Sequence, residues 1–570
     1  GDSTCQAAFG ADATCQSGRC VTEIDWVDLD GEPGNGCECP ATTGLALDTP
    51  DLIDANPTAG DTYRDRNCDG IDGDAATAIF VVSGAVGGDG SLASPYGSIQ
   101  QAVDAFGVGD THILVASGVY AERVTLKNSV QLFGGYSSDF TARDIVLFPT
   151  VVGGPAPSAG QTPGTVQAEA ITQSTTFAGF TIIGYDATDP GTASYGIYIR
   201  ASSSALVVAN NTIIAGKGAG GGRGANGATG GGGGAGAAGL KSKECADGTC
   251  SEGVETQLGG AGGTNGSCAA APGCPGMEAD TDEDPQVIDT AQSGCTYADG
   301  GDQGQYNGSD ASYCKYDFNP SGNQTGPSGG DGTVGGSGNG GSGCSDLDGQ
   351  VSGNVWVAAA GSSGGTAGSV GAGGQGGSAG GWVDNVKTAA CTVPVTGGNF
   401  GDVGASGAGG GAGGCGGTAG GPGDAGGASF AVFVSSGAGG TFATLRTNTI
   451  TRGAGGQGGR GGNGGTGGKG GSGGIGGFAI WPAWAAGIGG NGGRGGDGGG
   501  GGGGGGACGG PSYGIAGVGI PASTYDAANV FQTSNSAPTG GLGGSHGTGP
   551  GAAGDGTSGA TGESSNMKVY

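Results

Sequence analysis

A run of Gly-Gly-X triplets is the feature that most constrains the fold of this chain. Residues 458–474 repeat two glycines and one other residue, with Arg460, Asn463, Thr466, Lys469 and Ser472 at every third position. Glycine loses more backbone entropy on folding than any other residue, so such a run stays disordered unless regular backbone hydrogen bonds offset the loss. Because 149 of the 570 residues are glycine, this choice concerns about a quarter of the chain.

The triplet period favours ordered helices of the polyglycine II type. A polyproline-II-type helix has three residues per turn, so the X side chains would form one ridge, and glycine pairs would let neighbouring backbones exchange hydrogen bonds. With only 22 prolines and no strict Gly-X-Y period, the chain is not collagen. The alternative is a flexible linker. The pattern predicts bundle segments over 216–239, 329–343, 360–381, 403–428, 453–477 and 488–510. These tracts resemble glycine-rich bundles of a snow-flea-type antifreeze protein and of some phage tail-tip adhesins.

The charge balance narrows the classes of partner. Nineteen Lys and Arg face 49 Asp and Glu, a formal net charge of -30. Such a surface repels phosphate backbones, so we expect no nucleic-acid partner. No stretch approaches the roughly 20 apolar residues of a membrane helix, so we expect no membrane span.

Sixteen cysteines in two groups, Cys5 to Cys68 and Cys245 to Cys508, predict disulfides and an oxidising compartment. The paired-cysteine pattern of structural zinc sites is missing, and His112 and His546 lie far from the cysteine groups in sequence. Since the sequence begins Gly-Asp-Ser, we interpret it as a processed chain that is secreted or displayed on the cell surface.

Residues 1–77 are predicted to be a small Cys-rich head whose six cysteines pair among themselves. Within it, Asp65, Asn67 and Asp69 stand at alternate positions before Gly70, as in the first half of a calcium loop, and Asp72 could join them. Ala76 replaces the Glu of a complete loop, so calcium at these four residues and a plain Asx turn both remain open.

From residue 78 onward, short β-branched runs alternate with turn residues. Ser98 followed by apolar residues at helical spacing predicts one helix over 98–106. The spacing of the remaining runs predicts stacked turns of strands rather than a βαβ sheet. The predicted strands cover residues 79–82, 112–116, 123–126, 130–133, 177–183, 195–199 and 206–214.

Three segments here resemble the opening of secreted right-handed parallel β-helix proteins of the pectate-lyase-like superfamily. They are Leu92 to Val103, Ile113 to Tyr120 and Val130 to Tyr136. The resemblance implies a β-helix over 78–215 whose open end is capped by the helix. Segments Cys15 to Cys20 and Asp30 to Glu38 are similar to Cys-rich modules of myxobacterial-type secreted proteins. Neither resemblance names an activity, because the β-helix is shared by enzymes, adhesins and structural proteins.

An internal repeat indicates how the glycine tracts connect to these strands. Residues 211–213 and 448–450 both read Asn-Thr-Ile, and glycine-rich residues 221–231 and 458–468 follow them at the same distance. We therefore expect an all-β fold, a right-handed parallel β-helix interrupted by polyglycine II excursions. Its expected parts are the head (1–77), the β-helix (78–215), Gly-rich excursions with a disulfide-pinned insert at 240–350 (216–425), a returning rung (426–452), a second excursion (453–510), and a final rung with a Gly-rich tail (511–570).

Residues for catalysis are scarce in the sequence. A β-helix lyase needs calcium-binding carboxylates and a basic residue on neighbouring rungs, but Arg123, Lys127 and Arg200 lack accompanying Asp pairs. Asp139, Asp144 and Asp186 are scattered in turns, unlike a glycosidase pair. We therefore predict no catalytic residues and a structural or adhesive protein that self-associates into fibres or matrix. The alternative is a carbohydrate-active lyase or hydrolase, or a protein that binds a surface polysaccharide.

Overall fold

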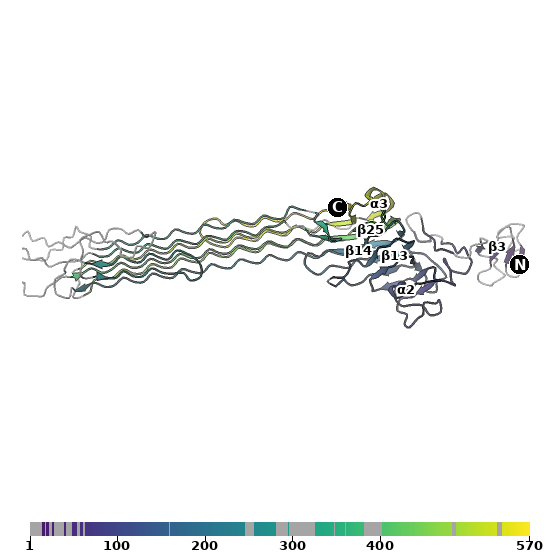
Figure 1. Ribbon diagram of the computed structural model, residues 1–570, viewed down its shortest axis with the longest axis horizontal. Helices are drawn as coiled ribbons and strands as arrows, with labels where there is room; N and C mark the ends of the chain where they lie inside the picture. The colour runs from purple at the N-terminus through teal and green to yellow at the C-terminus, as the bar shows by residue number, and fades with distance from the viewer. Residues whose placement is uncertain are drawn as a thin grey trace, which may run out of the picture.

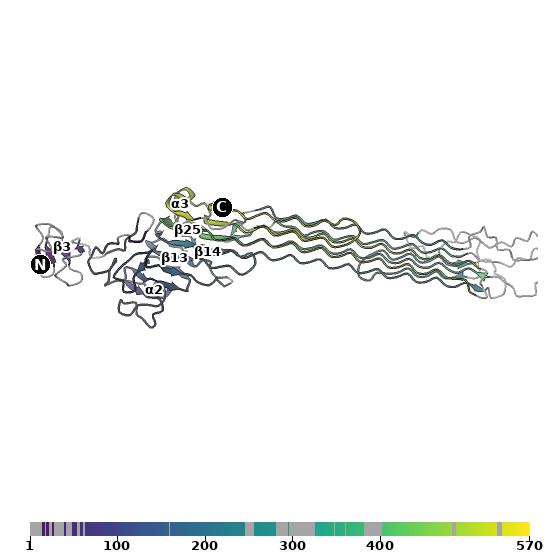
Figure 2. The same cartoon turned by 180° about the vertical axis from the view of Figure 1, so that it is seen from behind.

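The computed structural model describes residues 14–16, 19–21, 25–27, 39–41, 48–53, 58–60, 63–158, 160–244, 256–280, 295, 325–346, 348–358, 361–380, 402–480, 486–532 and 539–570. The described elements are mostly β-strands, with two helices, α2 (Ile99–Ala105) and α3 (Ala522–Ala528). Figures 1 and 2 show a stack of short strands from which a long bundle of extended chain projects to one side. None of the described helices is long and apolar enough to cross a membrane.

The stack of strands, here called the coil, consists of three six-stranded sheets in which all neighbouring strands run parallel. The first sheet contains, in spatial order, β24 (Thr444–Arg446), β15 (Leu206–Ala209), β12 (Thr175–Ala178), β9 (Gln131–Tyr136), β6 (Ile113–Ala116) and β5 (Ile79–Val81). The second contains β27 (Val530–Gln532), β25 (Thr449–Thr451), β16 (Thr212–Ile214), β13 (Phe180–Ile183), β10 (Thr150–Val152) and β7 (Gly118–Tyr120). The third contains β28 (Ser564–Val569), β26 (Ser512–Gly517), β23 (Ser429–Val434), β14 (Ser194–Arg200), β11 (Val166–Glu169) and β8 (Val124–Leu126).

Successive strands visit the three sheets in turn, so the chain winds through the stack. For example, β12, β13 and β14 lie in different sheets, and each pairs with a strand of the next turn, β15, β16 and β23. This arrangement of stacked parallel sheets is compatible with a parallel β-helix. Apolar side chains from all three sheets fill the interior, among them Ile113, Leu132 and Ile182.

Two of the predicted strands were wrong in extent, because each is two strands that meet at a corner. The predicted strand 177–183 divides at Gly179, whose φ is +85°, and the predicted strand 206–214 divides at Asn210, whose φ is 53°. Thr447 lies at the same corner in the next turn of the coil and has a φ of 51°. Glycine and asparagine adopt this left-handed conformation most readily, which explains their use there.

An asparagine ladder follows this corner. The Asn211 side chain accepts a hydrogen bond from the Phe180 amide at 2.9 Å, and Asn448 and Asn529 accept from the Asn211 and Asn448 amides, both at 3.1 Å. All three asparagines are buried, so the ladder satisfies backbone N–H groups that the bend takes out of the sheets.

The predicted helix is confirmed as α2, which packs against β5, β6 and β8. Its N-cap is Ser98, whose side chain accepts from the Gln101 amide. The Glu122 carboxylate adds to this cap by accepting from the amides of Ile99 at 2.8 Å and Gln100 at 3.0 Å. The helix buries Ile99, Ala102 and Val103, and so covers one end of the coil.

The remaining strands are short and antiparallel. A four-stranded sheet contains β1 (Thr14–Gln16), β2 (Arg19–Val21), β3 (Asp25–Val27) and β4 (Cys39–Ala41). Three two-stranded pairs are β17 (Lys243–Glu244) with β22 (Asp402–Val403), β18 (Thr256–Gln257) with β19 (Ala279–Asp280), and β20 (Gln350–Ser352) with β21 (Val355–Val357).

Glycine-rich segments leave the coil after β16, β25 and β27 and form the projecting glycine bundle (Figure 1). Their backbone hydrogen bonds repeat at every third residue, as the polyglycine II prediction requires. Thus the amides of Gly218, Gly221 and Gly224 donate to the carbonyls of Ala454, Gln457 and Arg460 at 2.8–2.9 Å. The hydrogen-bonded segments are 218–242, 260–264, 271–277, 326–344, 363–380, 405–427, 454–478, 487–510, 539–548 and 554–560.

Two of these segments lie at the centre of the bundle. Segment 405–427 exchanges hydrogen bonds with six others, namely 218–242, 260–264, 271–277, 363–380, 454–478 and 487–510. Segment 487–510 likewise has six partners, namely 326–344, 363–380, 405–427, 454–478, 539–548 and 554–560. Six neighbours around one helix is hexagonal packing, which leaves little space for side chains, and most residues of the two segments are glycine.

The uninterrupted glycine run 498–506 marks the place where neighbours surround segment 487–510. Farther out, its X positions carry Asn491, Arg494 and Asp497. The next X positions are Gly500 and Gly503, where an added Cβ would lie 2.2 and 2.0 Å from the carbonyl oxygens of Gly547 and Gly544. The segments 539–548 and 554–560 therefore cover the ridge where the side chains disappear from the sequence.

Side chains on the uncovered part of the ridge take over the role of the missing neighbour. The Asp497 carboxylate accepts from the Gly470 amide at 2.9 Å, and the Asn491 side chain accepts from the Gly476 amide at 2.8 Å. The Asp331 carboxylate accepts from the Arg494 amide at 2.7 Å. These acceptors satisfy N–H groups that another segment would otherwise bind.

Disulfides and serines fasten the bundle. Cys268–Cys415, Cys274–Cys295 and Cys344–Cys508 are bonded, and no described cysteine is free. The Ser429 hydroxyl donates to the Gly216 carbonyl at 2.7 Å, and Ser512 donates to Gly453 at 2.6 Å. Each serine thus ties a returning strand to the point where its excursion left the coil.

Within the predicted insert 240–350, residues 260–264, 271–277 and 326–344 belong to the glycine bundle. The insert's aromatic residues at 297–318 lie outside the described residues. Cys68 is disulfide-bonded, but the pairing of the other head cysteines also lies outside the described side chains.

Candidate functional site

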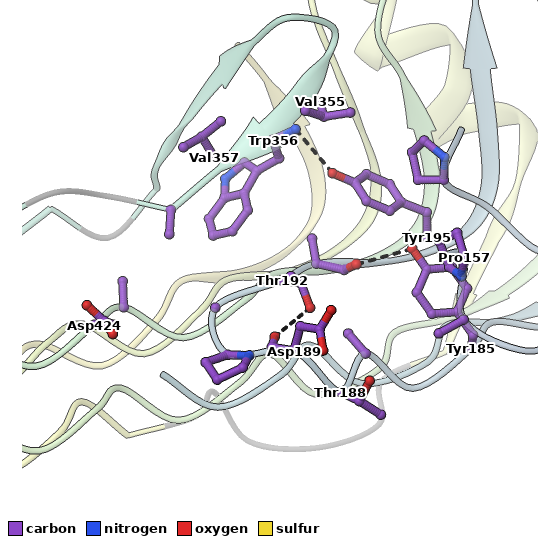
Figure 3. Close-up of a pocket in the computed structure, with 18 of the residues that line it drawn as sticks. Pro157, Tyr185, Thr188, Asp189, Thr192, Tyr195, Val355, Trp356, Val357 and Asp424 are labelled. Atoms are coloured by element: carbon purple, nitrogen blue, oxygen red, sulfur yellow. Dashed lines mark hydrogen bonds between the residues drawn. The ribbon is translucent and has the colours of Figure 1, made fainter. Parts of the chain in front are cut away.

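A cavity of about 760 Å³ lies where the glycine bundle meets the coil (Figure 3). Three stretches far apart in sequence form its walls: the connection 187–193 between β13 and β14, the β20–β21 hairpin with residues 355–358, and the bundle residues 422–425. Pro157, Gln161 and Pro163 close it from the loop between β10 and β11.

One wall of the cavity is aromatic. It contains Tyr185, Tyr195 and Trp356, which are all buried. The Tyr195 hydroxyl accepts a hydrogen bond from the Trp356 amide at 3.1 Å, which fastens the hairpin to the coil (Figure 3). Behind it, the Tyr195 ring stacks on Phe430 with ring centroids 5.2 Å apart, and Phe430 stacks on Tyr513 at 6.0 Å.

Burial raises the pKa values of Tyr185 and Tyr195 above the usual range, so both phenols stay neutral at physiological pH. The Tyr185 hydroxyl lies 3.2 Å from the Ala193 carbonyl and donates to it. The two tyrosines therefore shape the wall, and their hydroxyls hold the hairpin and the 187–193 connection in place.

The opposite side of the cavity is polar and open. Asp189 and Asp424 are exposed there, and Thr192 donates to the Asp189 carbonyl at 2.6 Å (Figure 3). A cavity with an apolar wall and a few polar groups is suited to bind a small or extended ligand. The two carboxylates favour a ligand that carries hydroxyl or cationic groups.

The three basic residues considered for lyase chemistry lie apart from one another. Lys127 pairs with Asp104 at 2.6 Å, and Arg200 pairs with Glu169 at 3.2 Å. Arg123 donates to the carbonyls of Gly164 and Thr162 and to the Gln161 side chain. Each of the three thus holds a local element of the coil in place.

The scattered aspartates also serve local structure. Asp144 accepts from the amides of Val146 and Leu147, both at 2.9 Å, and Asp186 accepts from the Lys217 amide at 2.8 Å. The Asp139 carboxylate accepts from Ser137 and Thr141 within its own turn.

The four residues predicted for calcium lie on one loop but do not share one centre in the described structure. Asp65 accepts from the amides of Cys68 at 2.6 Å and Gly70 at 2.8 Å, as in an Asx turn. Asn67 donates to Asp69 at 2.9 Å, while Asp72 pairs with Arg143 at 2.7 Å. The part of the chain that the structure describes contains no group of three or more His, Cys, Asp or Glu side chains placed to hold a metal. Calcium at this loop stays a prediction.

Asn210 illustrates a position that sequence alone leaves ambiguous. It begins an Asn-Asn-Thr sequence of the kind that carries N-linked glycans, but it is 5% exposed. Its side chain accepts from the Ile53 amide at 3.0 Å and donates to the Ile53 carbonyl at 2.7 Å. Asn210 therefore attaches the segment before the coil to a corner and is not accessible to a glycan in the folded chain.

One sequence feature points to the cavity, the Gly353-Asn354 pair. These residues have φ values of 58° and 69°, so they form the tight turn of the β20–β21 hairpin that presents Trp356.

A search of protein families, of curated proteins and of solved structures finds no match to this chain.

Proposed function

We propose that this chain is an extracellular structural protein, secreted or displayed on the cell surface, that acts as a rigid and elongated scaffold. In this proposal, copies associate into fibres or matrix, or attach to a surface polysaccharide. The disulfides support an oxidising compartment. The glycine bundle is the feature that makes the molecule long.

The hydrogen-bonded packing of the bundle is the observation that carries this proposal. Segments 405–427 and 487–510 each bond to six neighbours, so bending the bundle requires many backbone hydrogen bonds to break together. At about 3.1 Å per residue, a segment such as 218–242 is on the order of 75 Å long. Such a stiff rod has the properties that a spacer or a fibre unit requires.

The finer fold assignment is also part of the proposal. We infer a right-handed parallel β-helix of the pectate-lyase-like type, supported by the three parallel sheets and by α2 at one end. An experimental structure tests this inference, and left-handed winding or antiparallel pairing in the coil would refute it.

Small-angle X-ray scattering together with negative-stain electron microscopy tests the scaffold. We expect one elongated particle of constant length in several buffers. A compact particle, or a coil with a flexible tail, would contradict the proposal.

Self-association needs a separate measurement. Sedimentation velocity over a wide concentration range should show assemblies that microscopy resolves as fibres or sheets. A rod that stays monomeric at all concentrations would refute self-association but would leave the scaffold proposal intact.

The cavity favours a second candidate function, carbohydrate binding. Its apolar wall beside the exposed Asp189 and Asp424 carboxylates would let sugar hydroxyls donate to the carboxylates while the sugar packs against the wall. Calorimetry with neutral and acidic oligosaccharides would test it, with Asp189→Ala, on an exposed loop, expected to weaken binding at least tenfold. Asp186→Ala, an exposed carboxylate outside the cavity lining, is the matched control. Equal affinity for all three proteins, or no binding, would overturn it. Cleavage of the oligosaccharides would instead favour the enzyme alternative.

A further inference from the structure

Lys568, near the end of the last strand β28, lies between two carboxylates. Its Nζ is 2.7 Å from Oδ2 of Asp348 and 3.0 Å from Oε2 of Glu563. Asp348 precedes the β20–β21 hairpin, more than two hundred residues away in sequence, while Glu563 directly precedes β28. The three side chains therefore join parts of the chain that only the fold brings together.

Aromatic residues line one side of this cluster, while the Asp348 and Glu563 side chains are 40% and 38% exposed. The Tyr513 hydroxyl donates to Glu563 at 2.8 Å, and the Lys568 ammonium lies 5.8 Å from the Tyr513 ring centre and 6.0 Å from that of Tyr570. The backbone at Asp348 is fixed as well, because its carbonyl accepts from the Trp356 indole at 2.7 Å and from the Tyr570 hydroxyl at 3.3 Å.

The burial of its side chain distinguishes Lys568 from Lys469, which forms a close Lys–Asp pair in the glycine bundle. The Lys568 side chain is 19% exposed. Lys469, whose Nζ lies 2.9 Å from Asp497, is 81% exposed and is a surface ion pair. Among the described residues, Lys469 has one carboxylate within ion-pair distance, whereas Lys568 has two, Asp348 and Glu563.

We propose that Lys568 and Asp348 condense to an intramolecular amide cross-link, with Glu563 as the catalytic acid and base. The two side chains are already paired, since Nζ of Lys568 lies 2.7 Å from an oxygen of the carboxyl group whose carbon it would attack. Reacting groups held in this way behave as if present at about 10⁵–10⁸ M. No cofactor, oxidant or other reactant takes part.

The atoms of the step balance. Glu563 takes one proton from the Lys568 ammonium group and passes it to the Asp348 carboxylate, so that a neutral amine faces a neutral carboxyl group. The lone pair of the amine then attacks Cγ of Asp348. A Cγ–Nζ bond forms, the nitrogen loses a second proton, and the carboxyl oxygen of Asp348 that holds the first proton takes up the second. The Cγ–O bond then breaks, and one water leaves. Glu563 ends as it began, as a carboxylate.

The electrostatics of the cluster assign the proton carrier. A hydrogen bond with the Glu563 carboxyl, helped by the Lys568 ammonium, lowers the pKa of Asp348. Burial opposes the charge on Lys568, but the bonds to Asp348 and Glu563 outweigh burial and raise its pKa. Both shifts favour the ion pair, so a proton must move from Lys568 to Asp348 before the amine can attack. Glu563 lies beside Lys568 and is placed to carry that proton.

The mass of the intact protein after full reduction and denaturation tests the proposal. We expect a mass lower by one water than the sequence requires, and a peptide pair joined through Lys568 and Asp348 after proteolysis. A full-length mass with no cross-linked peptide would overturn the proposal, whether or not the chain acts as a scaffold.

Variants separate the cross-link from other losses of water. Lys568→Arg keeps the positive charge but cannot form this amide, so the missing water should return. An Asp-Gly succinimide loses the same mass but would persist in Lys568→Arg, and this outcome would also overturn the proposal. Glu563→Gln should slow or abolish the reaction. Lys469→Arg is the matched control and should leave the mass deficit unchanged.

Discussion

The carbonyl oxygen of Gly544 occupies the space that a side chain on Gly503 would need. An added Cβ at residue 503 would lie 2.0 Å from that oxygen, far inside the contact distance. Six residues earlier on the same ridge, Asp497 faces no such neighbour and is tolerated. This relationship connects the sequence directly to the packing: the X residue of a triplet is glycine where another segment covers it.

We predict that Gly503→Ala destabilises the protein by about 3 kcal/mol, because the methyl group forces two backbone segments apart. Asp497→Ala on the same ridge should cost about 1 kcal/mol, since it removes two ion pairs with exposed cations and the acceptor of the Gly470 amide but moves no backbone. Chemical denaturation of both variants measures the difference. Equal, small effects would mean that the segments do not pack as described.

The triplet run 458–474 permits a second comparison. Gly464→Val places its Cβ 1.9 Å from the Gly501 carbonyl oxygen, so it should be at least as damaging as Gly503→Ala. Thr466→Ala should have a small effect. The side chains at the X positions also contribute to packing, because the Asn463 side chain accepts from the Ser545 amide at 3.2 Å. Asn463→Ala should therefore cost about 1 kcal/mol, measured by its melting temperature.

The asparagine ladder predicts a large effect inside the coil. Asn448→Ala removes the acceptor of the Asn211 amide and both donors of a buried side chain, so it should destabilise by about 3 kcal/mol. Thr449→Ala, at the next, half-buried position, should cost less than about 1 kcal/mol. If thermal unfolding ranks the two variants in the opposite order, the ladder does not hold the corners.

Much of the architecture could be predicted from particular residues. Ser98 and the apolar spacing after it indicated α2, and the triplets indicated the bundle segments. Strand lengths could not be predicted, because the sequence around Asn210 looks like one continuous strand. Only the packing of successive turns of the coil bends the chain there. The helix α3 and the strand β28 were missed, because short polar sequences such as Ser564–Val569 form a strand only when they pair with a neighbour, here β26.

The cavity lay beyond sequence reasoning for a physical reason. Trp356, Thr192 and Asp424 belong to stretches that approach one another only after the bundle has folded back on the coil. No local pattern encodes that meeting. The same holds for segments 539–548 and 554–560, whose position is visible in the sequence only indirectly, as the glycine run 498–506 that they cover.

Acid should stabilise the part of the chain just before the coil, where Asp48 lies beside Arg66 and Asp72. Burial raises the pKa of Asp48 from its ordinary 3.8 to about 6, with Arg66 and Asp72 as its charged neighbours. The folded state then holds the proton more tightly than the unfolded state, so stability from this group is present below pH 3.8 and is lost as the pH rises through 6.

Comparison with Asp48→Asn isolates this effect. The variant should gain on the order of 2 kcal/mol relative to the native chain between pH 4 and pH 7.5. Melting temperatures measured across this range check the prediction. A constant difference between the two proteins would show that Asp48 does not titrate in the folded state.

Removal of a disulfide tests how the bundle is fastened. Cys344–Cys508 closes a sequence separation of 164 residues and joins two bundle segments near the coil. Replacing both cysteines by alanine should cost about 3–5 kcal/mol. Denaturant titration should show this loss, and an unchanged midpoint would mean that the two segments are held equally well without the bond.

Amide hydrogen exchange over Gly501 to Gly506 tests the central claim, a solid glycine bundle, most directly. Each of these six amides donates to a carbonyl of another segment at 2.8–3.0 Å, although the run contains no side chain at all. We predict that they exchange only when the whole bundle unfolds, and so remain protected for hours under native conditions. Exchange within seconds, at the rate of an unstructured polyglycine chain, would contradict the account.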